Sequence, residues 1–219
     1  MCGSGYTGVV VEVSGPGRGG PSLRDEQVAQ TRAALVAAGR RLFGQDGYAG
    51  TSVEDLAREA RVTTGALYHH FPTKTALFET VFEEVHTGLL AASADAAASA
   101  SDEVEALAVG FEAFLDAMLT PEVQRIIITD APAVLGLSRF TELDERYAVA
   151  AIVTELQAAA AAGRLRADDP ETLARLLLGA LTRGSMLIAG SPDSRQTRDQ
   201  VVRTIRALLT GLAHPPAPA

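Results

Sequence analysis

The sequence predicts an all-α protein of about nine helices. Alanine, which has the best helix propensity, contributes 39 of the 219 residues. From Arg24 onward, apolar residues recur at the spacing that places them on one face of a helix. Ser, Thr and Asp stand where such helices would begin, and Gly or Pro where they would end.

The first helix is expected over residues 24–45, after a flexible Gly-rich arm formed by residues 1–23. Seven of the first 20 residues are glycine, so the arm buries too little to offset the entropy lost on ordering. The helix should stop before Gly47, because glycine favours helix ends. Its expected buried face comprises Val28, Leu35, Val36, Leu42 and Phe43.

Two short helices should follow. The run Thr51-Ser-Val-Glu54 has the pattern of a capping box, in which Thr51 caps the helix and Glu54 reaches back to it. Thr63 can cap a second short helix that runs to about His70. Residues 24–72 are therefore predicted to form a helix-turn-helix domain of three helices.

Longer helices should make up a second domain over residues 73–213, followed by a flexible tail over residues 214–219. The helix starts carry capping or first-turn residues such as Thr73 and Pro170, and Gly163 supplies a stop. The expected ranges are 73–98, 102–119, 121–130, 139–162, 170–189 and 193–212.

Composition and motifs exclude several classes of protein. The single cysteine, Cys2, can form neither an internal disulfide nor a zinc site, and no metal or cofactor is expected. A GxGxxG pattern at 15–20 lacks the helix and the series of strands that a dinucleotide site needs. The longest apolar stretch, 172–190, is interrupted by Arg175 and Arg183, so no membrane span is expected and the protein should be cytoplasmic. No pattern for nucleophilic catalysis is present, so an enzyme is not expected.

The second short helix has the residue pattern of a helix that reads DNA in the major groove. Val62 and Leu67 would face inward and anchor it. Gly65 would let the backbone approach DNA closely. The outward side chains would be Thr64, Ala66, Tyr68 and His69.

Charge around this helix differs from that of the whole chain. The formal net charge of −8 argues against nucleic-acid binding in general, because phosphates attract basic side chains. No acidic residue, however, lies between Ala60 and Phe78. Lys74 and the amides at the start of the next helix are candidates for holding a phosphate, together with Arg32 and Arg41.

Five stretches of the first domain closely resemble the DNA-binding domain of the TetR family. They are TRAALVAAGRRLF (31–43), GY (47–48), TSVEDLA (51–57), ARVTTGALYHHF (60–71) and KTAL (74–77). The resemblance implies a homodimeric, ligand-responsive transcriptional regulator, usually a repressor, that binds a pseudopalindromic operator in double-stranded DNA. A helical small-molecule-binding protein without DNA-binding activity is the alternative.

The resemblance also implies roles for single residues. The residue matching Thr51 contacts phosphate, and the one matching Lys74 contacts the DNA backbone. Those matching Thr63, Thr64, Ala66, Tyr68 and His69 face DNA. The complete predicted DNA-binding set is Thr51, Ser52, Arg61, Thr63, Thr64, Gly65, Ala66, Tyr68, His69 and Lys74.

Arg61 departs from the family pattern, because members often have glycine in this turn. If the position is left-handed, a residue other than glycine costs roughly 1 kcal/mol there. An additional cation near a DNA phosphate would compensate for that cost.

The rest of the chain resembles the family only generally, as expected of a ligand-binding domain that varies among members. Apolar and aromatic residues of its middle helices either form ordinary core or line a cavity for a lipophilic small molecule. The candidate lining residues are Phe82, His86, Phe111, Phe114, Met118, Ile127, Leu137, Phe140 and Tyr147.

The last two helices carry apolar stripes that either pack within the chain or form a four-helix interface in a homodimer. The resemblance to the family favours the interface. Its candidate residues are Leu173, Leu177, Leu181, Val202, Ile205 and Leu209.

Overall fold

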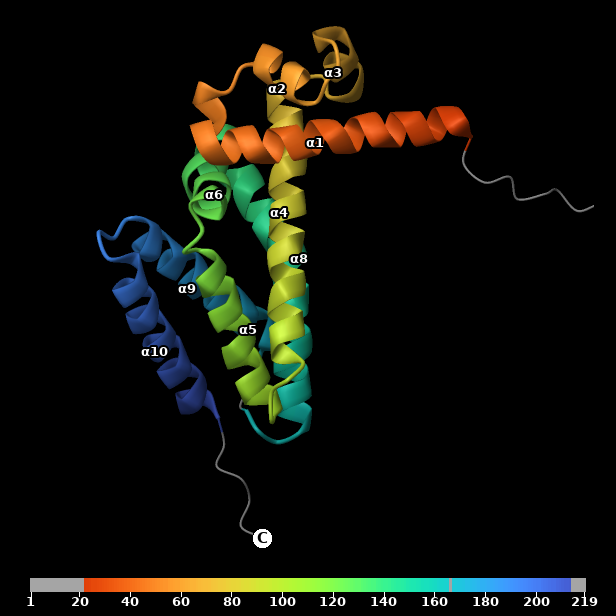
Figure 1. Ribbon diagram of the computed structural model, residues 1–219. Coiled ribbons are helices and arrows are strands. Elements are labelled where there is room, and N and C mark those ends of the chain that lie inside the picture. Colours follow the sequence, from red (N-terminus) through yellow and green to blue (C-terminus); the bar gives the residue numbers. More distant parts are fainter. Residues whose placement is uncertain (1–21, 166, 214–219) are drawn as a thin grey trace, which may run out of the picture.

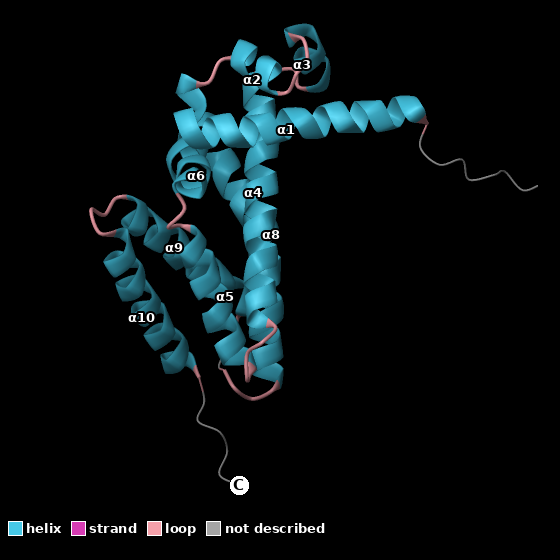
Figure 2. Cartoon of the chain, viewed as in Figure 1, coloured by secondary structure: helices cyan, strands magenta, loops and turns pink. Residues whose placement is uncertain are grey.

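A computed structural model describes residues 22–165 and 167–213, and over these residues it confirms the predicted all-α fold (Figure 1, Figure 2). The first seven elements are α1 (Leu23–Gly50), α2 (Val53–Glu59), α3 (Thr64–His70), α4 (Lys74–Ala97), α5 (Glu103–Ala117), α6 (Pro121–Val123) and η1 (Gln124–Asp130). The remaining four are α7 (Ala131–Leu135), α8 (Leu137–Ala161), α9 (Pro170–Ala189) and α10 (Ser194–Leu212).

Helix α4 connects the two parts of the molecule. At one end it packs against α1, and farther along it packs against α5 and α8. Figure 1 shows α1 crossing α4 near the end that carries α2 and α3, with α5, α8, α9 and α10 gathered around the other end. Helix α4 begins at Lys74 and packs against both parts, so the division near residue 73 stays a prediction.

Helix α1 starts one residue earlier than predicted. Ser22 caps it in a capping box, since the Asp25 amide donates to Ser22 Oγ and the Ser22 amide to Asp25 Oδ2. The last two residues of the predicted arm thus belong to this helix and its cap, and residues 1–21 lie outside the described residues. The prediction that Val28 is buried is wrong, because the first turns of α1 extend beyond the body of the molecule (Figure 1).

The junction between α1 and α2 differs from the predicted capping box. Helical geometry is interrupted at Gly47, whose φ of 76° is accessible to glycine without strain. Ser52, not Thr51, caps α2 by accepting a hydrogen bond from the Asp55 amide at 3.0 Å. The Thr51 hydroxyl is buried and donates to the Gly47 carbonyl at 2.8 Å. Its inward orientation prevents the predicted capping role.

The predicted caps of α3 and α4 are confirmed, because Thr63 and Thr73 each accept an amide hydrogen bond three residues ahead. The single helix predicted over 121–130 is instead divided into α6, the π-helical segment η1 and α7. The Ala131 amide donates to the Ile126 carbonyl, five residues earlier, which is the hydrogen-bond pattern of a π-helix. A uniform helical period cannot reveal this extra residue in the turn.

Helix α9 is, by length and composition alone, the only helix among the described residues that could cross a membrane. In the structure it packs against α8, α10 and η1. At Gly184 of α9, an added Cβ would lie 2.7 Å from Val201 of α10, so glycine is needed for the two helices to approach so closely.

Candidate nucleic-acid interface and internal cavity

Helix α3 is anchored on one side and open on the other. Leu67 is completely buried, and Val62 in the preceding turn packs against the same core. Tyr68 is 53% exposed. Thr63, Thr64, Gly65 and His69 also lie at the surface, whereas Ala66 is half-buried. The side chains predicted to read DNA therefore share one free surface, and their contacts with DNA remain a prediction.

The turn between α2 and α3 depends on a left-handed residue. Arg61 has a φ of 57°, and the Val62 amide donates back to the Ala57 carbonyl at 2.9 Å. This pattern closes the end of α2 in the way that glycine usually does. The Arg61 side chain is exposed beside α3.

The Arg61→Gly variant tests whether this exposed cation compensates for the strain of its backbone. The free energy of unfolding should rise by up to about 1 kcal/mol, because glycine adopts positive φ without a Cβ clash. Operator affinity should fall, and the slope of log affinity against log salt should become shallower by about one, because one phosphate contact is lost. Denaturant unfolding and DNA titrations at several salt concentrations measure both. An unchanged slope would make Arg61 a turn residue without a DNA contact.

Lys74 has an internal role that the sequence did not reveal. Its Nζ donates to the Tyr48 carbonyl at 2.8 Å and to the Thr51 carbonyl at 2.9 Å, and it lies 4.0 Å from the centre of the Tyr48 ring. The ammonium thus joins the start of α4 to the segment between α1 and α2. Two of its three donors are thus used inside the protein, and the predicted contact with the DNA backbone stays a prediction.

The predicted role of Thr51 needs correction, because its buried hydroxyl already donates to Gly47 and cannot reach a phosphate. Ser52 Oγ donates to Asp55 Oδ2 at 2.5 Å, and this hydrogen bond, followed by that from Arg58, lowers the pKa of the Asp55 carboxyl. The acid stays ionised at the start of α2, where negative charge is favoured.

The arginines of α1 are only partly available for phosphate. Arg41 forms an ion pair with Glu59 of α2. Arg32 lies 4.9 Å from the centre of the Phe71 ring and donates to Thr80 of α4 at 3.3 Å. Both pairs are at the surface, where such contacts contribute little free energy and exchange readily with other partners.

Two polar contacts join η1 and α6 to the first domain. The Tyr48 amide donates to Asp130 Oδ2 at 2.7 Å, and Arg40 Nε pairs with Glu122 Oε1 at 2.6 Å. Tyr48 therefore receives contacts from both sides, since its carbonyl also accepts from Lys74 of α4. A displacement of either α4 or η1 would be transmitted to the start of α2.

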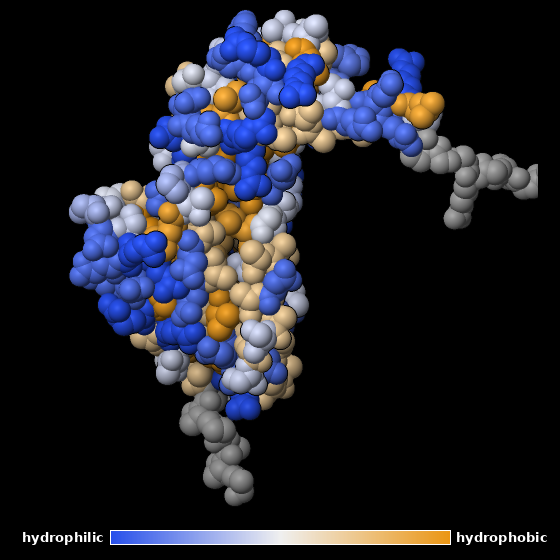
Figure 3. Space-filling view, in the orientation of Figure 1, coloured by the Kyte–Doolittle hydropathy of each residue, from blue (hydrophilic) through white to orange (hydrophobic). Residues whose placement is uncertain are grey.

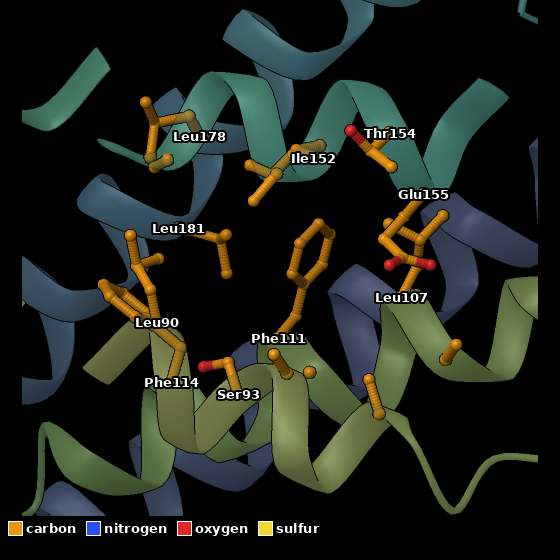
Figure 4. Close-up of a pocket in the computed structure, with 16 residues that line it drawn as sticks. Leu90, Ser93, Leu107, Phe111, Phe114, Ile152, Thr154, Glu155, Leu178 and Leu181 are labelled. Atoms are coloured by element: carbon orange, nitrogen blue, oxygen red, sulfur yellow. The ribbon is translucent and has the colours of Figure 1, made fainter. Parts of the chain in front are cut away.

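The second domain contains a cavity of about 250 Å³ between α4, α5, α8 and α9, which is partly open to solvent beside the exposed residues Ala94 and Ala151 (Figure 4). Its walls are mainly apolar, with the rings of Phe111 and Phe114 from α5 and with Leu181 from α9. The polar residues Ser93 of α4 and Thr154 and Glu155 of α8 also line it, and the Thr154 hydroxyl donates to the Ala150 carbonyl at 2.9 Å. This volume lies just below the range of about 300–1,000 Å³ that is usual for ligand sites.

Of the nine predicted lining residues, only Phe111 and Phe114 line this cavity. Leu137 is 73% exposed at the start of α8, far from any interior site. The other six do not line the cavity: Phe82, His86, Met118, Ile127 and Phe140 are buried in the core, and Tyr147 packs against this core. Most of the predicted residues lie on α4, α5 and α8, which do line the cavity, but on other faces and turns, whereas Ile127 lies on η1 and the lining helix α9 was not included. The small residues that create the space, such as Ala94 and Gly110, carry no aromatic signal.

His86 belongs to a buried polar cluster instead. Its Nε2 lies 3.0 Å from Asp144 Oδ1, and Thr182 Oγ1 donates to Asp144 Oδ2 at 3.3 Å. The Phe82 ring stacks on the imidazole, with 5.5 Å between the ring centres. The cluster joins α4, α8 and α9 one turn from cavity residues on each of these helices, and it holds them in fixed register.

The predicted dimer interface is wrong in its residues. Five of the six lie inside the protomer, and Leu173 packs partly buried against the same core: the five are Leu177, Leu181, Val202, Ile205 and Leu209. A side chain that is buried in the core of its own protomer has no exposed surface with which to contact a partner subunit. The apolar residues of α9 and α10 that do reach the surface are Leu176, Met186, Leu187 and Leu208. On the face shown in Figure 3, hydrophilic residues cover α10 and apolar residues follow the neighbouring strip along α5 and α4.

Comparison with known proteins places these observations in one family. Residues 35–81 match the family described as bacterial regulatory proteins, tetR family, and residues 104–212 match the tetracyclin repressor-like C-terminal domain. The Tn10 TetC protein of Escherichia coli is 23% identical over 189 residues, which cover 86% of this chain and 95% of TetC. The regulator TtgR of Pseudomonas putida is 38% identical over 61 residues, 28% of this chain and 29% of TtgR.

A solved structure extends the likeness to the whole fold. A TetR-family transcriptional regulator from Pectobacterium atrosepticum is 33% identical, with a TM-score of 0.79, over 88% of this chain and 98% of that one. Members of this family are DNA-binding transcriptional repressors, often ligand-responsive, and they are not enzymes. The helix-turn-helix domain, its connection through α4 and the C-terminal helical domain all fit this description, and the chain belongs to the TetR family of transcriptional regulators.

Proposed function

We propose that this protein is a cytoplasmic repressor that binds a pseudopalindromic operator as a homodimer and is released from it by a small lipophilic effector. The observation that carries the proposal is the free surface of α3, which presents Thr64, Gly65, Tyr68 and His69 while Leu67 is buried. A short helix of this exposure fits the major groove of DNA.

A second copy of the chain is the proposed partner of α9 and α10. TetR-family regulators act as dimers. Leu176 and Leu187 lie three turns apart on the same face of α9, and Leu208 is exposed on α10. In a twofold interface each of these leucines would be buried in both protomers. The interface would also set the distance between the two α3 helices.

Effector release is proposed to act through the ends of α4 and η1. Ligand in the cavity would change the spacing of α4, α5, α8 and α9, three of which, α4, α8 and α9, are joined by the His86 cluster. The movement would reach Tyr48 through Lys74 and Asp130 and would turn α2 and α3. By thermodynamic linkage, an effector that weakens operator binding is itself bound less tightly by the protein–DNA complex.

The Gly65→Ala variant separates DNA contact from folding. A Cβ at Gly65 would meet only Thr63 Oγ1, at 3.8 Å, so alanine fits the free protein and should raise its stability by up to about 1 kcal/mol. If α3 approaches the DNA backbone at Gly65, the same methyl group should lower operator affinity by roughly tenfold. Retardation of the DNA fragment upstream of the gene measures this affinity.

Gly88→Ala is the matched control, because Gly88 is an exposed helical glycine on α4 with no neighbour within 4 Å of an added Cβ. It should bind operator like the unchanged protein. Failure of the unchanged protein to retard any upstream fragment selectively would contradict the proposed function, and equal affinities of the two variants would contradict the proposed contact.

A further inference from the structure

We propose that the cavity binds a small lipophilic amine in its cationic form, held at one end by Ser93 and at the other by Glu155. The inference rests on the proposed function, in which this cavity is the effector site. It adds the chemical class of the effector, which follows from the polar groups of the cavity wall and from their partners.

Ser93 is the first of these groups. Hydroxyls on the long helices usually donate to the carbonyl four residues earlier, as Thr154 does to Ala150 at 2.9 Å and Ser185 does to Leu181 at 2.9 Å. The Ser93 Oγ is buried and has no hydrogen-bond partner among the described residues. A buried hydroxyl without a partner loses its hydration without compensation, so a ligand that hydrogen-bonds to it recovers this loss.

Glu155 is the second group. It is half-buried where α8 borders the cavity, and no ion pair or hydrogen bond among the described residues involves its carboxylate. Other glutamates of the same helix are paired, since Glu142 contacts Arg139 at 2.7 Å and Glu145 contacts Arg175. In the view of Figure 4, the Phe111 ring lies between Ser93 and Glu155. Both polar groups and this ring line the same cavity, so the inferred pose packs an aromatic ligand against Phe111 with its polar ends toward Ser93 and Glu155.

The sign of the charge expected on the ligand follows from the charged side chains in and around the cavity. Among the described residues, none that lines the cavity is Lys, Arg or His. Residues 86–219 also carry 17 acidic and only 11 basic side chains, which attracts cations and repels anions. An ammonium would form a charge-assisted hydrogen bond to Glu155, whereas a carboxylate would be placed near a like charge without a counterion.

Three indoles of matched shape test the inference by isothermal titration calorimetry on the full chain at pH 7. They are tryptamine, which is a cation, tryptophol, which is neutral, and indole-3-acetate, which is an anion. We expect tryptamine to bind about tenfold more tightly than tryptophol, because the carboxylate is only half-buried and solvent screens part of the attraction. Indole-3-acetate should bind more weakly than tryptophol.

Two variants assign the preference to the named groups. Glu155→Gln should lower tryptamine affinity about tenfold and leave tryptophol affinity unchanged, so that the preference disappears. Ser93→Ala should weaken both ligands by the same factor, roughly fivefold, because each indole N–H loses one hydrogen bond. The matched control is Asp95→Asn, which removes an exposed carboxylate beside cavity residue Ala94 and should change neither affinity.

The inference is overturned if the three indoles bind equally, if indole-3-acetate binds best, if Glu155→Gln keeps the preference, or if none binds at millimolar concentration. Operator retardation is measured in parallel. If the unchanged protein still retards operator DNA when any of these results is obtained, the proposed repressor function stands. Only the proposal of an amine ligand is then rejected. If tryptamine binds as expected but no DNA fragment is retarded, the proposed amine site stands and the proposed repressor function is rejected.

Discussion

Replacing Lys74 with methionine is expected to lower the free energy of unfolding by about 3 kcal/mol and to abolish operator binding for every DNA sequence tested. The ammonium donates to the Tyr48 and Thr51 carbonyls and lies against the Tyr48 ring. Charged hydrogen bonds of this kind contribute about 1.5–3 kcal/mol each and the contact with the ring about 1 kcal/mol, but they share one ammonium that is only half-buried, so their joint effect is smaller than the sum. Methionine keeps the length of the side chain but removes the ammonium donor from both carbonyls, so that Tyr48 keeps only the long hydrogen bond from the Thr51 amide, at 3.4 Å.

Arg61→Gln is the matched control, because it removes one positive charge from the same domain at an exposed side chain. It should leave stability within about 0.5 kcal/mol and make the salt dependence of DNA binding shallower by about one. Denaturant unfolding and DNA titration distinguish the two cases. A stable Lys74→Met protein with a shallower salt slope would support the role of Lys74 as a phosphate contact and contradict the internal role.

The different outcomes for Lys74 and Leu67 show which features of a sequence are predictable. Helical periodicity and capping residues depend on neighbours in the chain, and they located α2, α3 and the cap at Thr63 correctly. The partners of Lys74 are carbonyls 23 and 26 residues earlier, which lie just after the break in helical geometry at Gly47. No local pattern states which carbonyls a break leaves free.

The cavity was mispredicted for a related reason. Aromatic residues on the middle helices mark core and cavity walls alike, and only the packing decides between them. His86 faces Asp144 because α4 and α8 meet there, and Leu137 faces solvent because α8 begins at that residue. A cavity forms where small residues meet across helices, so its position is a property of packed faces.

Whether a leucine faces the core of its own protomer or the solvent also determines the prediction for the dimer interface. Stripes of leucine on α9 and α10 were expected to form the interface, yet Leu177 and Leu209 are buried in the protomer's own core. The interface must therefore use the side chains that remain outside this core. On α9 the most exposed of these are Leu176, at 67%, and Leu187, at 47%, and on α10 it is Leu208, at 51%.

Leu187→Glu is expected to convert the dimer into a folded monomer at micromolar concentration and to lower operator affinity at least a hundredfold. In a twofold interface the new carboxylate is buried twice, and burial of an unpaired charge costs several kcal/mol each time. Operator binding falls because a monomer contacts a single half-site. Light scattering and DNA titration measure the two effects, and Leu208→Glu should reproduce them from α10.

Leu137→Glu provides the control, since it makes the same substitution at a leucine that is 73% exposed at the start of α8. Its assembly state and operator affinity should not change, because a surface carboxylate remains hydrated. Circular dichroism would show that all three variants keep their helices. Dimers that persist in both Leu187→Glu and Leu208→Glu would exclude this face as the interface. The buried apolar residues of α9 and α10 already pack in the protomer's own core and cannot form the interface instead. Assembly would then have to use other helices, and those helices would determine the distance between the two α3 helices.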